Sequence, residues 1–139
     1  MIPIPSLLLA VVFVFLSAIH FQWVFGGTWG LKNAIPKVDG EPLFEPRKSL
    51  TLLVSIALLA GAFFSVWRGA FPSLGPAWIP HAGTWAIAIT FALRAVGDFR
   101  YCGFFKRVRG TAFARNDSLL YSPLCATISG LALWLAIGY

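Results

Sequence analysis

The chain has 139 residues, of which 58% are hydrophobic and 12% are charged, and its mean hydropathy is +0.78. About a quarter of the residues in an ordinary soluble domain are charged, so the composition excludes a soluble globular domain. Its high hydrophobicity also excludes a disordered chain. The formal net charge of +6 fits the anionic inner surface of a membrane better than nucleic acid. We therefore expect one integral membrane domain covering residues 1–139.

Four apolar stretches are long enough to cross a bilayer, whose hydrocarbon core needs about 20 helical residues. They lie at about residues 4–25, 50–67, 79–99 and 119–137. Prolines lie near the starts of these stretches, where the missing N–H of proline costs a helix little. The sequence predicts an all-α polytopic membrane protein, a bundle of four transmembrane helices.

The basic residues indicate how these spans are oriented. Ten of the eleven Lys and Arg residues lie in or beside the segments 26–49 and 94–118, and only Arg68 lies between the second and third spans. Positively charged connections are typical of the cytoplasmic side of a membrane. We therefore expect both segments on the cytoplasmic face of the plasma membrane, and both termini outside the cytoplasm.

The segment FRYCGFFKRVRG at 99–110 continues directly from the third span. Its residues 101, 104, 105 and 108 are apolar and spaced as on one face of a helix. Four basic residues surround that face: Arg100, Lys106, Arg107 and Arg109. The pattern predicts a short amphipathic helix in the membrane interface, with its aromatic rings toward the acyl chains. This helix either only anchors the chain or forms a selective site for an anionic headgroup.

Polar side chains gather in the cytoplasmic half of the predicted bundle. His20 and Arg94 each lie five residues before the expected end of a span, which is about 8 Å at 1.5 Å per residue. Asp98 follows Arg94 by four residues, so we expect these two side chains to pair on one helix face. Ionisable groups within a span usually face the bundle interior. The pair therefore either only neutralises its own charge or lines a polar pocket opposite His20.

The spacing of the usual metal ligands disfavours a metal site. His81 lies at the outer end of the third span, a membrane leaflet away from His20. Cys102 and Cys125 form no CxxC pattern. We expect no metal and no cofactor.

Two segments beside the predicted spans contain residues that often end or begin helices. In HFQWVFGGTWG at 20–30, Gly26 and Gly27 follow the first span. They either end the helix, as glycine often does, or let a ligand approach the backbone beside His20. Before the fourth span, FARNDSLLYSP contains Asp117, and we expect Asp117 or a neighbour to cap that helix.

These segments resemble a family of small bacterial four-helix membrane proteins that is known as a domain of unknown function. The resemblance is carried by HFQWVFGGTWG at 20–30 and by RAVGDFRYCGFFKRVRGTAFARNDSLLYSPLC at 94–125, and it covers most of the chain. It implies a location in the bacterial inner membrane and brings no assigned activity. The positions that match the family's pattern are His20, Trp23, Gly26, Gly27, Trp29, Arg94, Gly97, Asp98, Phe105, Lys106, Asp117, Tyr121 and Pro123.

Three functions fit these features. The leading hypothesis is a protein that binds a lipid or another amphiphile in a polar pocket of the cytoplasmic leaflet. The candidate ligand-binding residues are Trp23, Gly26, Gly27, Trp29, Arg94, Lys106, Arg115 and Tyr121. The second is a membrane enzyme of the proton-transfer or isomerase type on a lipidic substrate, with His20 and Asp98 as catalytic groups. The third is a structural or interaction subunit. The expected partners are membrane lipids and not nucleic acid, and a homo-oligomer is left open.

Overall fold

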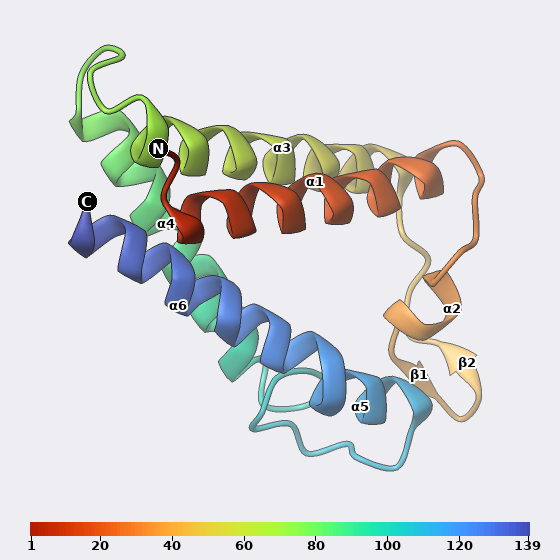
Figure 1. Cartoon of the computed structure of the whole chain (residues 1–139). Coiled ribbons are helices and arrows are strands. Elements are labelled where there is room, and N and C mark those ends of the chain that lie inside the picture. The colour runs from red at the N-terminus through yellow and green to blue at the C-terminus, as the bar shows by residue number, and fades with distance from the viewer.

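The computed structural model describes residues 1–139, and almost all of its regular structure is helical (Figure 1). Its four long helices are α1 (Ile4–Val24), α3 (Lys48–Ala70), α4 (Trp78–Val96) and α6 (Ser122–Gly138). Three helical stretches are long and apolar enough to cross a membrane, namely Ile4–Val24, Lys48–Ala70 and Ala112–Gly138. The chain therefore has the features of a membrane protein, and the helices predicted at 4–25 and 50–67 are confirmed to within a few residues.

Shorter elements connect the long helices. Between α1 and α3 lie α2 (Leu31–Ala34) and two antiparallel strands, β1 (Lys37–Val38) and β2 (Glu41–Pro42). The helix α5 (Ala112–Asn116) and the π-helical turn η1 (Asp117–Tyr121) lead directly into α6.

The helical stretch that contains α6 begins earlier than the sequence predicts. Its first residue is Ala112, and the N-cap is Thr111, whose side-chain oxygen accepts a hydrogen bond of 3.1 Å from the backbone N–H of Ala114. The expectation that Asp117 or a neighbour caps this helix is therefore wrong. The wider turn η1 directly precedes the first turn of α6, where Pro123 has no N–H to donate to the preceding turn.

The long helices form two antiparallel pairs (Figure 1). The first arm is α1 with α3, and the second arm is α4 with α6. The arms pack together toward the end that holds both termini, and they diverge toward the opposite end. We call this opposite end the basic end, because its connections, residues 25–47 and 97–111, contain seven of the eleven Lys and Arg residues.

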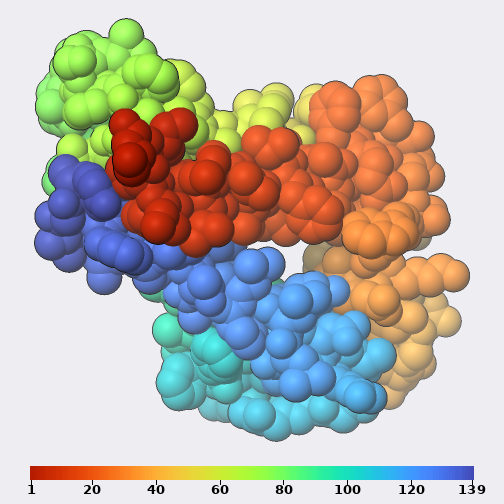
Figure 2. Space-filling model, viewed as in Figure 1, coloured from red at the N-terminus to blue at the C-terminus, as the bar shows by residue number.

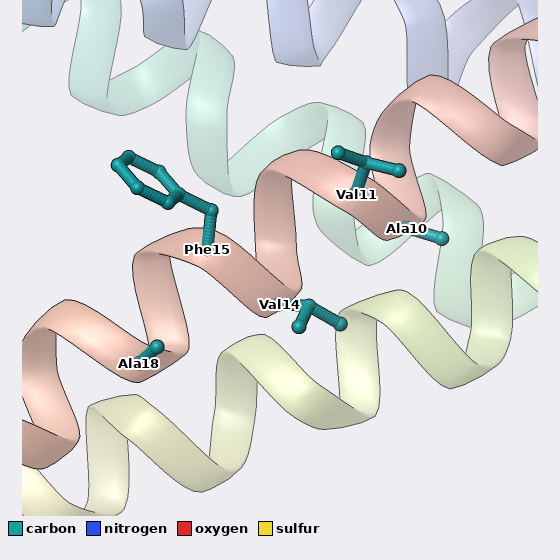
Figure 3. Close-up of a pocket in the computed structure, with 5 residues that line it drawn as sticks. All are labelled: Ala10, Val11, Val14, Phe15 and Ala18. Carbon is teal, nitrogen blue, oxygen red and sulfur yellow. The ribbon is translucent and has the colours of Figure 1, made fainter.

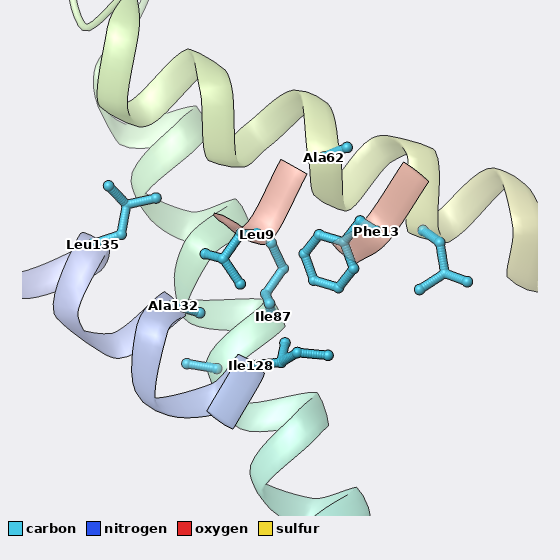
Figure 4. Close-up of a cluster of buried hydrophobic side chains, with 9 residues drawn as sticks. Leu9, Phe13, Ala62, Ile87, Ile128, Ala132 and Leu135 are labelled. Atoms are coloured by element: carbon cyan, nitrogen blue, oxygen red, sulfur yellow. The ribbon is translucent and has the colours of Figure 1, made fainter. Parts of the chain in front are cut away.

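A compact apolar core lies where the two arms cross (Figure 4). The ring of Phe13 on α1 packs against the ring of Phe91 on α4, with centroids 5.5 Å apart. Lipid tails are as apolar as these side chains, so close packing rather than transfer from water holds the arms together. The nine buried members of the core are Leu9, Phe13, Leu58, Ala62, Ile87, Ala88, Ile128, Ala132 and Leu135.

The outward side of α1 carries a shallow groove without polar side chains (Figure 3). It is lined by Ala10, Val11, Val14, Phe15 and Ala18. An apolar surface of this kind suits the lipid-facing side of a membrane helix.

The predicted amphipathic helix after the third span is wrong, because residues 97–111 form a loop. The helix α4 ends at Val96, where Gly97 adopts a φ of 88°. Gly97 and Gly103 pack backbone to backbone, and a Cβ atom on either would collide with a carbonyl group, that of Cys102 or that of Val96. The helical spacing of the aromatic residues was therefore misleading, since two glycines in the left-handed region fold the segment differently.

Candidate functional site

The carboxylate of Asp117 is the centre of the largest polar cluster in the molecule. The side chain is fully buried and lies in η1. Its Oδ1 accepts a hydrogen bond of 3.0 Å from Nη2 of Arg94. Its Oδ2 accepts bonds of 2.8 Å from the backbone N–H of Gly103 and of 3.0 Å from both Nζ of Lys106 and Oγ of Ser122. Four donors from three segments therefore stabilise one buried charge, and we call these groups the Asp117 cluster.

Lys106 lies inside this cluster with its side chain 1% exposed. Its ammonium group donates to Asp117, to Oγ of Ser118 at 2.6 Å and to the carbonyl of Gly103 at 3.0 Å. An ammonium group has three donors, and all three are used. Lys106 therefore ties the loop 97–111 to the start of the last helix.

Arg94 is only partly satisfied by the cluster. Its Nη2 binds Asp117, while its Nη1 is buried and has no hydrogen-bond partner. The side chain as a whole is 35% exposed. A buried donor without a partner is costly, so Nη1 has unused capacity to bind an anion.

The expected pairing of Arg94 with Asp98 is wrong. The i, i+4 relation applies only within a continuous helix, and α4 ends at Val96, before Asp98. The carboxylate of Asp98 instead accepts hydrogen bonds from the backbone N–H groups of Arg100, Tyr101 and Cys102, at 2.8 to 3.1 Å. It therefore fixes the turn that begins the loop.

These backbone bonds also set the charge of Asp98. Desolvation raises the pKa of this carboxyl group, but the three backbone hydrogen bonds outweigh it and lower the pKa to about 2. These bonds contribute fully to the stability of the folded state above the ordinary pKa of an aspartate. The contribution is lost as the pH falls through about 2, because the carboxylate then becomes protonated. Asp98 is thus an exposed, ionised residue that organises the turn.

His20 lies on the other arm. Its Nδ1 is 2.7 Å from the carbonyl oxygen of Leu16, and its ring packs against Trp23 with centroids 4.8 Å apart. The carbonyl only accepts, so Nδ1 carries the proton of this hydrogen bond. No hydrogen bond or ion pair joins His20 to Arg94 or Asp98, because the arms have diverged at this level (Figure 1).

Between the arms the surface is hollowed beside α1 and the first turns of α6 (Figure 2). We call this hollow the inter-arm cleft. Leu16, Phe91 and Leu124 lie partly buried against the apolar core. His20 follows Phe13 by seven residues, so it shares the helix face that Phe13 turns toward α4. His20 is thus directed toward the cleft from α1.

Tyr121 connects the two arms at the basic end. Its hydroxyl group donates a hydrogen bond of 3.1 Å to the carbonyl of Asn33 in α2, and its ring packs against Phe113 of α5. Arg115, also on α5, is exposed. The structure therefore brings Arg94, Lys106 and Tyr121 to the start of the last helix, and it leaves Arg115 at the surface.

The glycine pair after α1 turns the chain back on the helix. Gly26 has a φ of 87°, and the carbonyl of Trp29 then accepts hydrogen bonds from Trp23 Nε1 at 2.7 Å and Gln22 Nε2 at 3.0 Å. Trp29 as a whole remains 67% exposed. The turn therefore closes the end of α1, and the backbone of residue 29 rather than its ring makes the contacts.

Sequence reasoning missed the partners of Asp117. Ser122 and the backbone N–H of Gly103 donate to Asp117, and Ser118 accepts a hydrogen bond from Lys106. The sequence separation hides the contact of Gly103. One feature of the sequence pointed to a role other than capping. Proline is common at the first position of a helix, so an N-cap residue would lie directly before Pro123, whereas Asp117 lies six residues before it.

The described residues contain no group of three or more His, Cys, Asp or Glu side chains placed to hold a metal ion. Cys102 and Cys125 are free thiols. The groups of the Asp117 cluster offer ionic recognition and hydrogen bonding.

A family described as "Protein of unknown function (DUF3995)" matches residues 13–132, which is most of the chain. The chain belongs to this family, and the resemblance seen in the sequence is confirmed. A comparison with curated proteins and a comparison with solved structures find no match.

Proposed function

We propose that this protein binds a lipid or another amphiphile that has an anionic head, with the apolar part of the ligand in the inter-arm cleft. The observation that carries the proposal is the buried Nη1 of Arg94, which has no partner although it belongs to a permanently charged group. A carboxylate or phosphate oxygen is the acceptor that a guanidinium group binds best.

The surroundings of the cleft support an amphiphile rather than a polar ligand. Leu16, Phe91 and Leu124 offer an apolar surface at the edge of the core. His20 and Tyr121 offer polar groups nearer the basic end. A ligand that follows this gradient has its tail between the arms and its head toward the loops.

The roles of the other candidates follow from their contacts. Lys106 has no donor left, so it acts by holding Asp117 and the loop in place. Arg115 is exposed and attracts an anionic head from the surface. Trp23, with Gly26, Gly27 and the backbone of Trp29, closes the end of the helix that carries His20.

Binding is favoured over proton-transfer catalysis on geometric grounds. His20 and Asp98 belong to different arms, and the oxygen Oδ1 of Asp98 is occupied by three backbone N–H groups. A general acid or base must reach the reacting atom.

We further infer that α4 is a fourth membrane span and that the basic end faces the cytoplasm at the bacterial inner membrane. The 19 residues of α4 extend about 28 Å at 1.5 Å per residue, close to the thickness of a bilayer core. With four spans, both termini lie outside the cytoplasm, as the distribution of basic residues favours.

The ligand hypothesis is tested by native mass spectrometry of the purified protein and identification of the released lipid. Arg94→Lys keeps a charge beside Asp117 but removes the second guanidinium nitrogen, and His20→Gln removes the ring. A lost charged hydrogen bond lowers affinity about tenfold or more, so Arg94→Lys is expected to lose most of the bound lipid. His20→Gln removes the ring that the proposal places beside the ligand and is expected to lower the bound lipid as well.

His81→Gln is the matched control, because His81 is the second histidine and is exposed at the start of α4. It should keep the lipid content of the wild type. If folded Arg94→Lys and His20→Gln retain normal lipid content, the binding proposal is wrong.

A further inference from the structure

The loop 97–111 presents aromatic and basic side chains together at the basic end. Phe99 and Phe105 are 56% and 61% exposed, and their rings lie beside each other with centroids 6.4 Å apart. The exposed bases of the same loop are Arg100, Arg107 and Arg109. Its single acid, Asp98, is bound to the backbone of the loop and neutralises none of these arginines through a salt bridge.

The loop holds this arrangement through backbone contacts. The N–H of Phe104 donates to the carbonyl of Ala95 at 2.8 Å. The N–H groups of Arg107 and Val108 both donate to the carbonyl of Arg100, at 3.1 and 2.9 Å. Together with the bonds to Asp98 and Asp117, these contacts order the backbone that carries the exposed arginine and phenylalanine side chains. Two of the arginines also contact the loop itself, since Nη2 of Arg109 donates to the carbonyl of Phe104 at 3.2 Å and the guanidinium of Arg100 lies over the ring of Tyr101.

The backbone of Phe99 is strained in a way that favours exposure of its ring. Its φ of 63° lies in the left-handed region, which an aromatic residue rarely adopts. Such strain persists only where the surrounding structure enforces it, and it is often found at functional positions. In water, exposing two phenylalanine rings on a strained turn would not stabilise the fold. At a membrane interface they gain an apolar environment.

We propose that the loop 97–111 docks onto the headgroup region of an anionic leaflet and selects phosphatidylglycerol-like lipids over zwitterionic ones. Phe99 and Phe105 enter the acyl boundary, and Arg100, Arg107 and Arg109 bind lipid phosphates. Lys106, inside the same run, is turned inward to Asp117 and holds the loop rather than the lipid. This surface is separate from the inter-arm cleft and its ligand.

The charge pattern favours an anionic lipid surface as the partner. Guanidinium groups bind phosphate oxygens through paired hydrogen bonds, and basic segments beside a membrane bind anionic lipids more strongly with each added charge. The exposed rings between the arginines match the acyl boundary directly below those phosphates.

The test follows the thermal unfolding midpoint of the full-length protein in neutral detergent micelles. The micelles are titrated with phosphatidylglycerol or with phosphatidylcholine of the same acyl chains. For the wild type, we expect phosphatidylglycerol to raise the midpoint at a lower mole fraction than phosphatidylcholine. Inorganic phosphate should leave the midpoint unchanged. An equal shift by phosphate would overturn the proposal, because the site would then take a free anion.

Arg100→Gln/Arg107→Gln is expected to raise the mole fraction of phosphatidylglycerol at half-shift about thirtyfold. Lys32→Gln/Lys37→Gln removes the same charge from the other connection of the basic end and should cause a much smaller change. Equal effects of the two double variants would overturn the proposal, because anionic lipid would then be attracted by the total positive charge of the basic end and not by the loop 97–111. The difference between the two double variants should persist in a His20→Gln background, which separates the contribution of the loop from that of the cleft.

Phe99→Gly provides a second variant that relieves the strained φ, so it folds at least as well in neutral detergent. Because it also removes an inserting ring, we expect the half-shift mole fraction to rise several-fold. An unchanged titration in both Phe99→Gly and the loop double variant would refute docking by this loop.

Discussion

Asp117 carries a negative charge inside a helical stretch that is long and apolar enough to cross a membrane. The cost of burying a charge is offset only when partners and hydrogen bonds surround it. Arg94 and Lys106 supply opposite charges at 3.0 Å, and Ser122 and Gly103 complete the shell. The three charged residues therefore depend on one another, and the loss of one leaves the others uncompensated.

Asp117→Asn should destabilise the protein by about 3–5 kcal/mol, since it leaves Lys106 buried without its counter-charge. The free energy of unfolding can be measured by SDS titration in mixed micelles. Lys106→Met should lower it as well, and the double variant should lose less than the sum of the two single losses. Asp39→Asn at an exposed turn position is the control and should change stability by no more than about 0.5 kcal/mol. Additive losses in the double variant would contradict a coupled pair.

At the residue scale, the sequence was sufficient to single out Arg94, Lys106 and Tyr121, because charged or hydroxyl groups in an apolar chain are conspicuous. It could not supply their partners. Arg94 pairs with Asp117, 23 positions away, rather than with Asp98, four positions away. Local spacing is informative only while the helix continues, and the end of α4 depends on a backbone contact between two glycines.

At the scale of elements, the first arm is held by small and hydroxyl side chains between α1 and α3. Oγ of Ser6 donates to the carbonyl of Ser65 at 2.7 Å, and Oγ of Ser17 donates to the carbonyl of Ser55 at 2.8 Å. Gly61 lets the ring of Phe13 lie close to the α3 backbone. Small residues of this kind allow membrane helices to approach closely, and interhelical hydrogen bonds add to the attraction.

Gly61→Leu should therefore weaken the first arm. Even a Cβ atom at this position would lie 3.2 Å from the Phe13 ring, so a larger side chain forces the helices apart and should cost about 1–3 kcal/mol. Gly130→Leu is the matched control in α6, where nothing lies within 4 Å of an added Cβ atom. The unfolding free energies of the two variants in the same detergent provide the comparison. Equal losses would show that the penalty does not come from the contact between α1 and α3.

The sequence predicted the long helices better than their connections. Apolar runs without charges located α1 and α3, because length and hydropathy are properties of the run itself. Residues 99–110 have helical periodicity yet form a loop, since Gly97, Gly103 and the bonds to Asp98 and Asp117 determine the backbone. Contacts between distant segments decided this part of the fold.

At the scale of the whole molecule, the end at which the two arms diverge is also the end that holds the Asp117 cluster and the basic connections. The arms are joined by apolar packing where they cross and by the hydrogen bond of Tyr121 to Asn33 at the basic end. Between these two connections lies the inter-arm cleft (Figure 2). The chain has few charged residues, and seven of its eleven basic residues lie in the connections of the basic end.

The proposed topology predicts on which side of the membrane each connection lies. In a Cys102→Ser/Cys125→Ala background, single cysteines are introduced as Ser73→Cys between α3 and α4, Glu45→Cys before α3, and Arg109→Cys after α4. All three positions are exposed. An impermeant maleimide applied to intact cells should label only Ser73→Cys, because basic connections stay in the cytoplasm. All three should be labelled once the cells are opened, which controls for reactivity.

The comparison between Ser73→Cys and Arg109→Cys decides whether α4 crosses the membrane. These positions flank α4, so labelling of both in intact cells would mean that only three helices span the bilayer. Labelling of Glu45→Cys and Arg109→Cys without Ser73→Cys would reverse the orientation. In that case the arginines of the loop 97–111 would face away from the cytoplasm, and the rule that places positive charge inside would fail for this chain. Selective labelling of Ser73→Cys is the result that four spans require.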